Sequence, residues 1–329
     1  MYVEFLSKYI LLFQVLKIVD ASLGDQLESY RVCLYDCVNK DCDTDGYSNL
    51  KNEDYFSLSS FFKWPCFGEC KYICMWDTVN EFENAGMSIP QFYGKWPFVR
   101  YLGLQEPAST VFSLINLILH LKWLRKFRTK VPNDCPLYGL WHIFAIVCVH
   151  AWFWSVVFHA RDTSLTEFMD YAGAFSIVLV HCYVMVIRLT LKFGRFCCML
   201  ISLLFLMFYI KHALYLYWAS RIDYKYNMSL NLSIAIFTIT TWLIWAYWNR
   251  SNQPYVTNCV IYVILTSLVA LLEIIDRPPL FYIFDSHSIW HFSTTFLIGT
   301  FYKFAMSDCY YLRQKKIEET QFQIIKKLL

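Results

Sequence analysis

The feature that most constrains the fold is a series of apolar segments, each near 20 residues long, that runs from about residue 105 almost to the C-terminus. A helix needs about 20 apolar residues to cross a hydrocarbon layer roughly 30 Å thick. The sequence therefore predicts an all-α membrane protein built as a bundle of seven transmembrane helices. The predicted spans are 107–124, 137–159, 170–190, 197–218, 232–248, 257–275 and 287–305.

The composition agrees with a membrane environment. Hydrophobic residues make up 57% of the chain and charged residues only 17%, whereas soluble domains carry about 25% charged residues. The formal net charge of +3 is too small to indicate a nucleic-acid partner. Aromatic residues at the ends of the predicted spans, as in Tyr215-Leu216-Tyr217-Trp218, are typical of a membrane interface.

Lysine and arginine concentrate in the loops after the first, third and fifth predicted spans. Because basic loops favour the cytoplasmic side, this pattern predicts that residues 22–106 are luminal and that the C-terminus is cytoplasmic. Asn227 and Asn231 each begin an Asn-x-Ser sequon on a predicted luminal loop, which makes both candidates for glycosylation.

The N-terminus is typical of a secretory signal. An apolar run over residues 9–19 follows Lys8, and Val19-Asp20-Ala21 resembles a cleavage site with a small residue at its end. The run is too short to cross a bilayer as a helix. We therefore expect a signal peptide over residues 1–21, with an uncleaved anchor as the alternative.

Six of the 13 cysteines lie before the first predicted span: Cys33, Cys37, Cys42, Cys66, Cys70 and Cys74. An even cluster behind a signal peptide predicts three disulfides in an oxidising lumen. The spacing leaves the pairing open, and a metal cluster is the competing interpretation, disfavoured because no histidine lies nearby. The predicted domains are thus a signal peptide (1–21), a luminal Cys-rich region (22–104), a membrane core (105–306) and a cytoplasmic tail (307–329).

The chain ends with a dilysine, Lys326-Lys327, followed by two leucines. On a cytoplasmic tail this motif predicts retrieval within the early secretory pathway through recognition by a coat protein. The alternative is a basic amphipathic helix end, since charges alternate with Ile and Leu over residues 313–329.

Three histidines fall at the predicted luminal edge of the membrane. His159 ends the second span, and His287 and His291 begin the seventh. Residues four apart share one face of a helix, so the latter pair can offer two nitrogens to one metal ion, with His159 as a third ligand. Three protein ligands with a water in the fourth position are typical of catalytic zinc. A histidine pair that merely sits at the interface is the alternative.

Other polar residues lie at the same predicted depth. Ser155 precedes His159 by one turn and is placed to stabilise an oxyanion, and Asp170 opens the third span as a candidate general base. Glu273 and Asp276, near the end of the sixth span, are candidates for orienting the ligands or capping a helix. The remaining histidines that we considered are expected to serve packing or interhelical hydrogen bonds: His142, His150, His181 and His212.

Three segments resemble a known family. Ala151–Thr163 with Asp170-Tyr171, then Leu272–Pro279 with Asp285–His291, and Gly94–Arg100 are similar to motifs of GPI-anchor-remodelling proteins. These are the Per-like proteins of the post-GPI-attachment-to-proteins factor 3 family, in the CREST superfamily of lipid hydrolases and receptors. The likeness runs from about residue 20 to 312.

The resemblance implies a zinc-dependent hydrolase in which His159, His287 and His291 bind the metal and Ser155 and Asp170 act at the catalytic water. The implied substrate is the lipid of GPI-anchored proteins, and the implied reaction is hydrolysis of its sn-2 acyl ester to give a lyso-GPI. The dilysine ending is not uniform in the family, so we expect residence in the Golgi, the endoplasmic reticulum, or both. A related lipid amidase or receptor, or a non-catalytic escort of GPI-anchored proteins, is the alternative.

Overall fold

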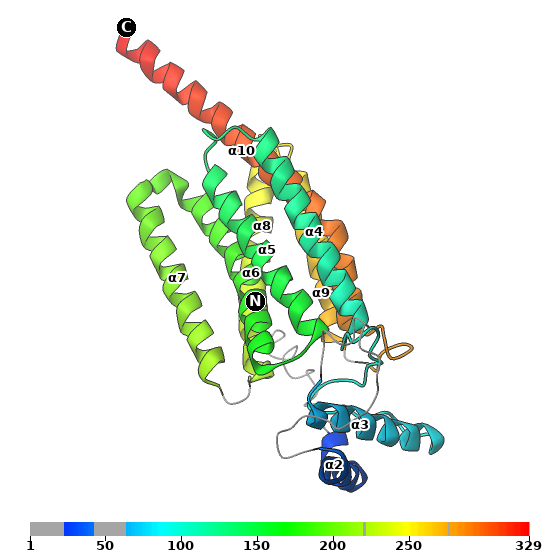
Figure 1. Cartoon of the computed structure of the whole chain (residues 1–329). Helices are drawn as coiled ribbons and strands as arrows, with labels where there is room; N and C mark the ends of the chain where they lie inside the picture. The colour runs from blue at the N-terminus through cyan, green and yellow to red at the C-terminus, as the bar shows by residue number, and fades with distance from the viewer. Residues whose placement is uncertain (1–22, 43–63, 220–221, 276, 329) are drawn as a thin grey trace, which may run out of the picture. The chain divides into compact units, whose positions relative to one another are not determined.

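The computed structural model describes residues 23–42, 64–219, 222–275 and 277–328, which fall into two compact units divided after Phe98. The predicted signal peptide over residues 1–21 and Asp276 lie outside the described residues. Within the described ranges the regular structure is helical, with only isolated β-bridges (Figure 1). The prediction of an all-helical fold is confirmed.

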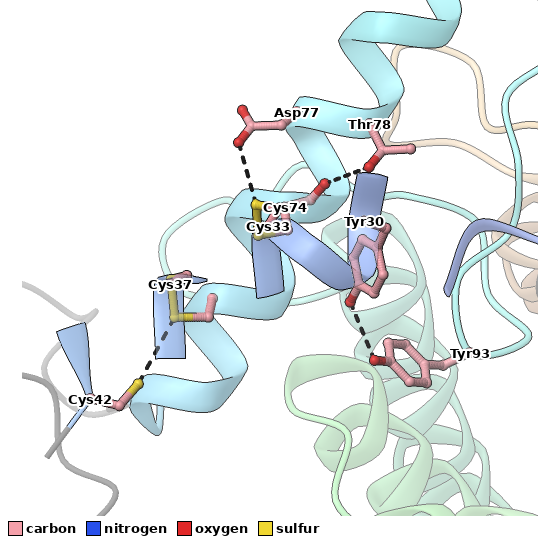
Figure 2. Close-up of a disulfide and its surroundings, with 9 residues drawn as sticks. Tyr30, Cys33, Cys37, Cys42, Cys74, Asp77, Thr78 and Tyr93 are labelled. Carbon is pink, nitrogen blue, oxygen red and sulfur yellow. Dashed lines mark hydrogen bonds between the residues drawn. A yellow bond between two sulfur atoms is a disulfide. The ribbon is translucent and has the colours of Figure 1, made fainter. Parts of the chain in front are cut away.

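The first unit contains two antiparallel helices, α2 (Glu28–Asp41) and α3 (Cys66–Asn84). Three disulfides join them: Cys33–Cys74, Cys37–Cys70 and Cys42–Cys66. Figure 2 shows Cys33, Cys37, Cys42 and Cys74 where the two helices meet. Cys33 and Cys37 of α2, like Cys66, Cys70 and Cys74 of α3, are four residues apart and share one helical face, and Cys42 follows directly after α2. Successive turns of α2 therefore meet successive turns of α3 in reverse order.

The disulfides compensate for a small core, which is typical of disulfide-rich secreted units. Tyr30 is a core residue here: it is 1% exposed, packs on Phe92 and donates a hydrogen bond to the hydroxyl of Tyr93 at 3.3 Å. The predicted three disulfides are confirmed. Although sulfurs of Cys42, Cys66 and Cys70 lie close together, all three belong to disulfides and supply no thiolate for a metal.

The second unit begins at Val99 and is a helical bundle. Each of its long helices begins close to the first residue of a predicted span, except α6 and α8, which begin several residues before theirs. The helices are α4 (Pro107–Lys130), α5 (Tyr138–Ala160), α6 (Ser164–Thr190), α7 (Arg195–Trp218), α8 (Tyr224–Asn249), α9 (Val256–Ile274) and α10 (Ser286–Leu328).

Five of these helices are long and apolar enough to cross a membrane: α5, α6, α7, α8 and α9. The other two, α4 and α10, coincide with the first and last predicted spans but are more polar. In the first half of α4 several polar side chains face inward, where Ser113 and Asn116 are fully buried. The predicted count of seven spans is therefore not confirmed, because hydropathy cannot separate a polar interior face from a helix that lies outside the bilayer.

Helix α10 packs between α4 and α9, while α5 packs against both α4 and α6. Aromatic rings fill the interior, with Trp141 and Phe144 of α5 against Phe301 of α10. Helices α5 and α6 lie close together at Gly173, where an added Cβ would lie 3.1 Å from Cα of Ala151. Small residues such as glycine allow helix backbones to approach this closely.

A buried ion pair fixes the end of the bundle opposite the predicted histidine site. Arg188 of α6 meets Asp308 of α10 at 2.9 Å, and Asp308, which is 0% exposed, also accepts a hydrogen bond from Tyr255 at 2.7 Å. The bundle thus continues beyond residue 306, where the sequence predicted a tail. The later part of α10 extends past the other helices of this unit (Figure 1), with Lys326 and Lys327 exposed on it.

Both sequon asparagines lie inside α8. Asn227 is 7% exposed, and its Oδ1 faces Nε2 of His212 at 3.0 Å, while Asn231 donates to the Asn227 carbonyl at 2.9 Å. A glycan at Asn227 would have to be attached before α8 packs against α7. Glycosylation at these two positions stays a prediction.

Candidate metal centre

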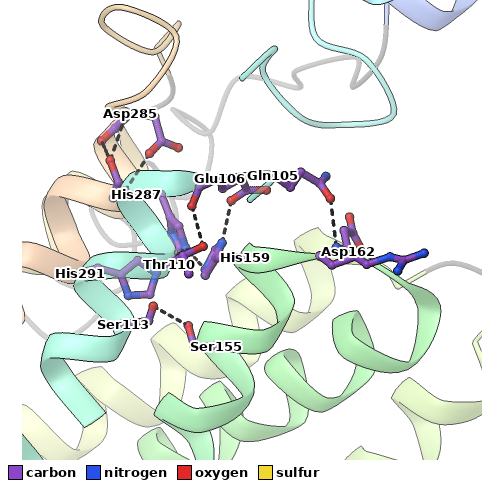
Figure 3. A network of polar contacts seen from close by, with 12 residues as sticks. Gln105, Glu106, Thr110, Ser113, Ser155, His159, Asp162, Asp285, His287 and His291 are labelled. Carbon is purple, nitrogen blue, oxygen red and sulfur yellow. Dashed lines mark hydrogen bonds and ion pairs between the residues drawn. The ribbon is translucent and has the colours of Figure 1, made fainter. Parts of the chain in front are cut away.

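The three predicted ligand histidines meet at one end of the second unit. Nε2 of His287 lies 2.9 Å from Nε2 of His291 and 3.4 Å from Nε2 of His159 (Figure 3). One nitrogen from each of the three rings lies within 4.8 Å of the corresponding nitrogens of the other two. His159 and His291 are buried, at 2% and 3% exposure.

Helix ends position these rings. Helix α5 ends at Ala160, directly after His159, because Arg161 turns to an extended conformation and Thr163 caps α6 through a capping box with Thr166. Helix α10 begins with a similar reciprocal cap, in which the Ser288 N–H donates to the Asp285 carboxylate at 2.8 Å and the Asp285 N–H to the Ser288 hydroxyl at 3.0 Å.

In two of the rings, the nitrogen that points away from the other histidines lies next to a carboxylate. Nδ1 of His159 lies 2.6 Å from Oε2 of Glu106, and Nδ1 of His287 lies 2.7 Å from Oε2 of Glu273. Glu106 is itself held in place, since its backbone N–H donates to the His159 carbonyl at 3.0 Å. Carboxylates in this position fix the tautomer and the orientation of metal-binding histidines.

The donor set fits a zinc ion. With Nδ1–H donated to a carboxylate, Nε2 of both His159 and His287 carries a lone pair, and two lone pairs directed at each other repel. A cation between them turns that repulsion into attraction. Zinc–nitrogen bonds of about 2.0–2.1 Å in a tetrahedron imply ligand nitrogens about 3.3 Å apart. Nε2 of His287 lies at a similar distance from Nε2 of His159, 3.4 Å, and from Nε2 of His291, 2.9 Å.

Ser155 is buried one turn before His159, and its hydroxyl lies 3.1 Å from that of Ser113 on α4 (Figure 3). Beside them Asn116 donates to the His291 carbonyl at 2.8 Å. The predicted serine is therefore part of a polar layer that joins α4, α5 and α10 next to the three imidazoles.

Asp170 lies half-buried in the second turn of α6. It precedes Gly173 by three residues, and Ser155 follows Ala151 by four. Because Gly173 and Ala151 are in contact across the two helices, Asp170 and Ser155 each lie about one turn from that contact toward the histidine end. The role of Asp170 in catalysis stays a prediction.

Sequence reasoning found Glu273 but missed Glu106, Ser113 and Asn116. A signal for them exists: Glu106, Thr110, Ser113, Asn116 and His120 recur at steps of three and four along a largely apolar segment. Such a polar stripe indicates a helix face turned into the bundle. Interhelical hydrogen bonds are seen for His181, with the Tyr262 hydroxyl at 2.8 Å, and for His212, with Asn227 at 3.0 Å. His142 and His150 instead make hydrogen bonds within α5, to the Tyr138 carbonyl and from Trp154.

Replacing Glu106 with glutamine should weaken zinc binding by about 10–100-fold. The amide keeps the size of the side chain but removes the charge that holds the tautomer and raises the basicity of His159. Competition titration of purified protein with a chromophoric zinc chelator measures the effect, and Glu318→Gln, an exposed change on the tail of α10, is the matched control. Unchanged affinity in Glu106→Gln would contradict the proposed role of the carboxylate.

The fold and the site together define a membrane-embedded helical bundle with a cluster of three histidines at one end. The model of the Per1-like family matches residues 57–309, and the chain belongs to that family.

Curated relatives cover nearly the whole chain. A Drosophila melanogaster protein named post-GPI attachment to proteins factor 3 is 41% identical over 86% of this chain and 88% of its own length. Human and Xenopus laevis proteins named GPI-specific phospholipase A2-like PGAP3 are 38% and 39% identical, over 97% and 90% of this chain and 98% and 92% of their own lengths. No solved structure matches the chain.

Proposed function

We propose that this protein remodels the lipid of GPI-anchored proteins by zinc-dependent hydrolysis of the sn-2 acyl ester, which yields a lyso-GPI. The observation that carries the proposal is the convergence of His159, His287 and His291, two of them backed by carboxylates, at one end of a bundle with membrane-length helices. The names of the relatives support the choice of lipid and of reaction.

The three imidazoles would hold the zinc, with Glu106 and Glu273 keeping the Nε2 lone pairs of His159 and His287 directed inward. When bound, zinc would lower the pKa of a coordinated water to about 7 and polarise a carbonyl. The hydroxyl of Ser155 stabilises the negative charge that develops on the ester oxygen.

Asp170 moves the proton. As general base it accepts one proton from water while the oxygen of that water bonds to the ester carbon. The bond from that carbon to the sn-2 oxygen then breaks, and Asp170 returns the proton to this oxygen. The products are a free fatty acid and the lyso-lipid, so no further reactant is required.

The site would face the lumen, because the basic loops after the first, third and fifth predicted spans lie at the opposite end of the bundle. GPI-anchored proteins are displayed on that side and would reach the site within the leaflet. The exposed Lys326 and Lys327 support retrieval by a coat protein, and hence residence in the Golgi, the endoplasmic reticulum, or both.

Lipid mass spectrometry on purified protein tests the activity. We expect release of the sn-2 fatty acid from a GPI-anchored substrate, with ceramide and ordinary phosphatidylcholine left intact. The double variant His287→Ala/His291→Ala provides the background rate. Cleavage of ceramide alone would indicate an amidase instead, and no cleavage by zinc-loaded protein would favour a non-catalytic escort.

A further inference from the structure

A basic cavity of about 420 Å³ lies near the end of the bundle away from the histidines. It opens between α4, α9 and α10, with α10 in the middle. Its lining includes three lysines, Lys126, Lys130 and Lys303, together with Tyr310, Ser307 and Asn258. The hydroxyl of Tyr310 donates to the backbone carbonyl of Lys130, whereas the three ammonium groups, Ser307 and Asn258 can each donate a hydrogen bond to a ligand.

The cavity has an excess of positive charge. Within the described ranges no carboxylate lies within ion-pair distance of the three ammonium groups, and the lining contains no acidic residue. Acidic groups at this end are engaged elsewhere: Asp134 pairs with Arg313 at 2.8 Å, and Asp308 with Arg188. Three like charges around one cavity repel one another unless an anion neutralises them.

The surroundings favour a lipid over a soluble anion. Lys303 is on the predicted span 287–305, near its end, and Lys126 and Lys130 follow the end of the span 107–124, so the ammonium groups lie at headgroup depth. Exposed apolar side chains continue from the cavity along the same helix faces toward the bilayer centre: Phe296, Ile261 and Leu265 are 68%, 42% and 40% exposed.

We propose that this cavity binds the phosphorylated headgroup of an anionic phospholipid, with the acyl chains lying along α9 and α10. A headgroup with a phosphate monoester in addition to its phosphodiester, such as a phosphoinositide, matches three ammonium groups better than a singly charged lipid. Basic pockets between transmembrane helices are suited to such headgroups. The site is separate from the histidines and does not depend on the proposed hydrolysis.

Native mass spectrometry of the full chain in phosphatidylcholine nanodiscs doped with phosphatidylinositol phosphate tests this. We expect the wild type to retain the phosphoinositide in preference to phosphatidylcholine. The triple variant Lys126→Gln/Lys130→Gln/Lys303→Gln should lose about tenfold or more in affinity. The corresponding triple arginine variant should keep it, since the charge remains.

The matched control removes the same charge outside the cavity, in Lys192→Gln/Lys315→Gln/Lys316→Gln, and should bind like the wild type. Wild-type affinity in the cavity glutamine variant would overturn the proposal, and so would equal occupancy by inorganic phosphate in nanodiscs of phosphatidylcholine alone. If the glutamine variant does not fold, Ser307→Trp, which fills the cavity and keeps every lysine, decides: retained binding there also overturns the site.

Discussion

The double variant His287→Ala/His291→Ala should purify with almost no zinc, whereas the wild type should hold about one ion per chain. Two of three ligands are lost, and the remaining His159 cannot retain a catalytic metal alone. Release of the sn-2 fatty acid should fall to background. Elemental analysis of protein purified without added chelator measures the first effect, and lipid mass spectrometry measures the second.

A matched control removes two histidines of α5 that lie outside the cluster, in His142→Ala/His150→Ala, and should keep its zinc. Chelation provides a second readout, since a metal that binds only the folded state raises the melting temperature. The chelator should therefore lower the Tm of the wild type and of the control but leave that of the site variant unchanged. A site variant that still carries one zinc per chain would refute the ligand assignment.

Asp170→Asn should reduce turnover by about 10²–10⁴-fold, the usual contribution of a general acid–base group. Asparagine has nearly the same shape but cannot accept the proton of water. The zinc content should stay at one per chain, which separates a role in proton transfer from a role in binding the metal. Single-turnover assays on a GPI substrate, with elemental analysis of the same sample, give both values.

Asp223→Asn is a suitable comparison for Asp170→Asn. Asp223 caps α8 by accepting from the Tyr226 N–H, and asparagine caps a helix about as well as aspartate. The control therefore removes one carboxylate without a change in fold and should keep full activity. Normal activity in Asp170→Asn would show that another group moves the proton.

The sequence predicted the parts of this fold whose signals are local. Apolar runs marked the helices because burial in lipid requires about 20 such residues in succession. The spacing of His287 and His291 predicted that both lie on one helix face. The alternation of basic and less basic loops predicted that His159 lies at the same side of the membrane as this pair. These inferences need only the period of a helix and the thickness of a membrane.

What the sequence did not yield depends on contacts between distant segments. Glu106 reaches His159 across 53 positions because Gln105 and Glu106, just before α4, donate backbone hydrogen bonds to the last two carbonyls of α5, and no local pattern encodes that pairing. The order of the disulfides likewise follows from the antiparallel placement of α2 and α3. The number of spans stayed open because the polar face of α4, which includes Asn116, is hidden only once the bundle has formed.

Helix α10 runs without a break over 43 residues, about 65 Å at the usual rise. His287 and His291 lie in its first two turns, the basic cavity in its middle, and the dilysine in its last turn. An α-helix resists bending and twisting, so a twist applied at its exposed tail would reach the imidazoles unless the Arg188–Asp308 pair absorbs it. That ion pair ties α10 to α6 at a point between the histidines and the exposed tail.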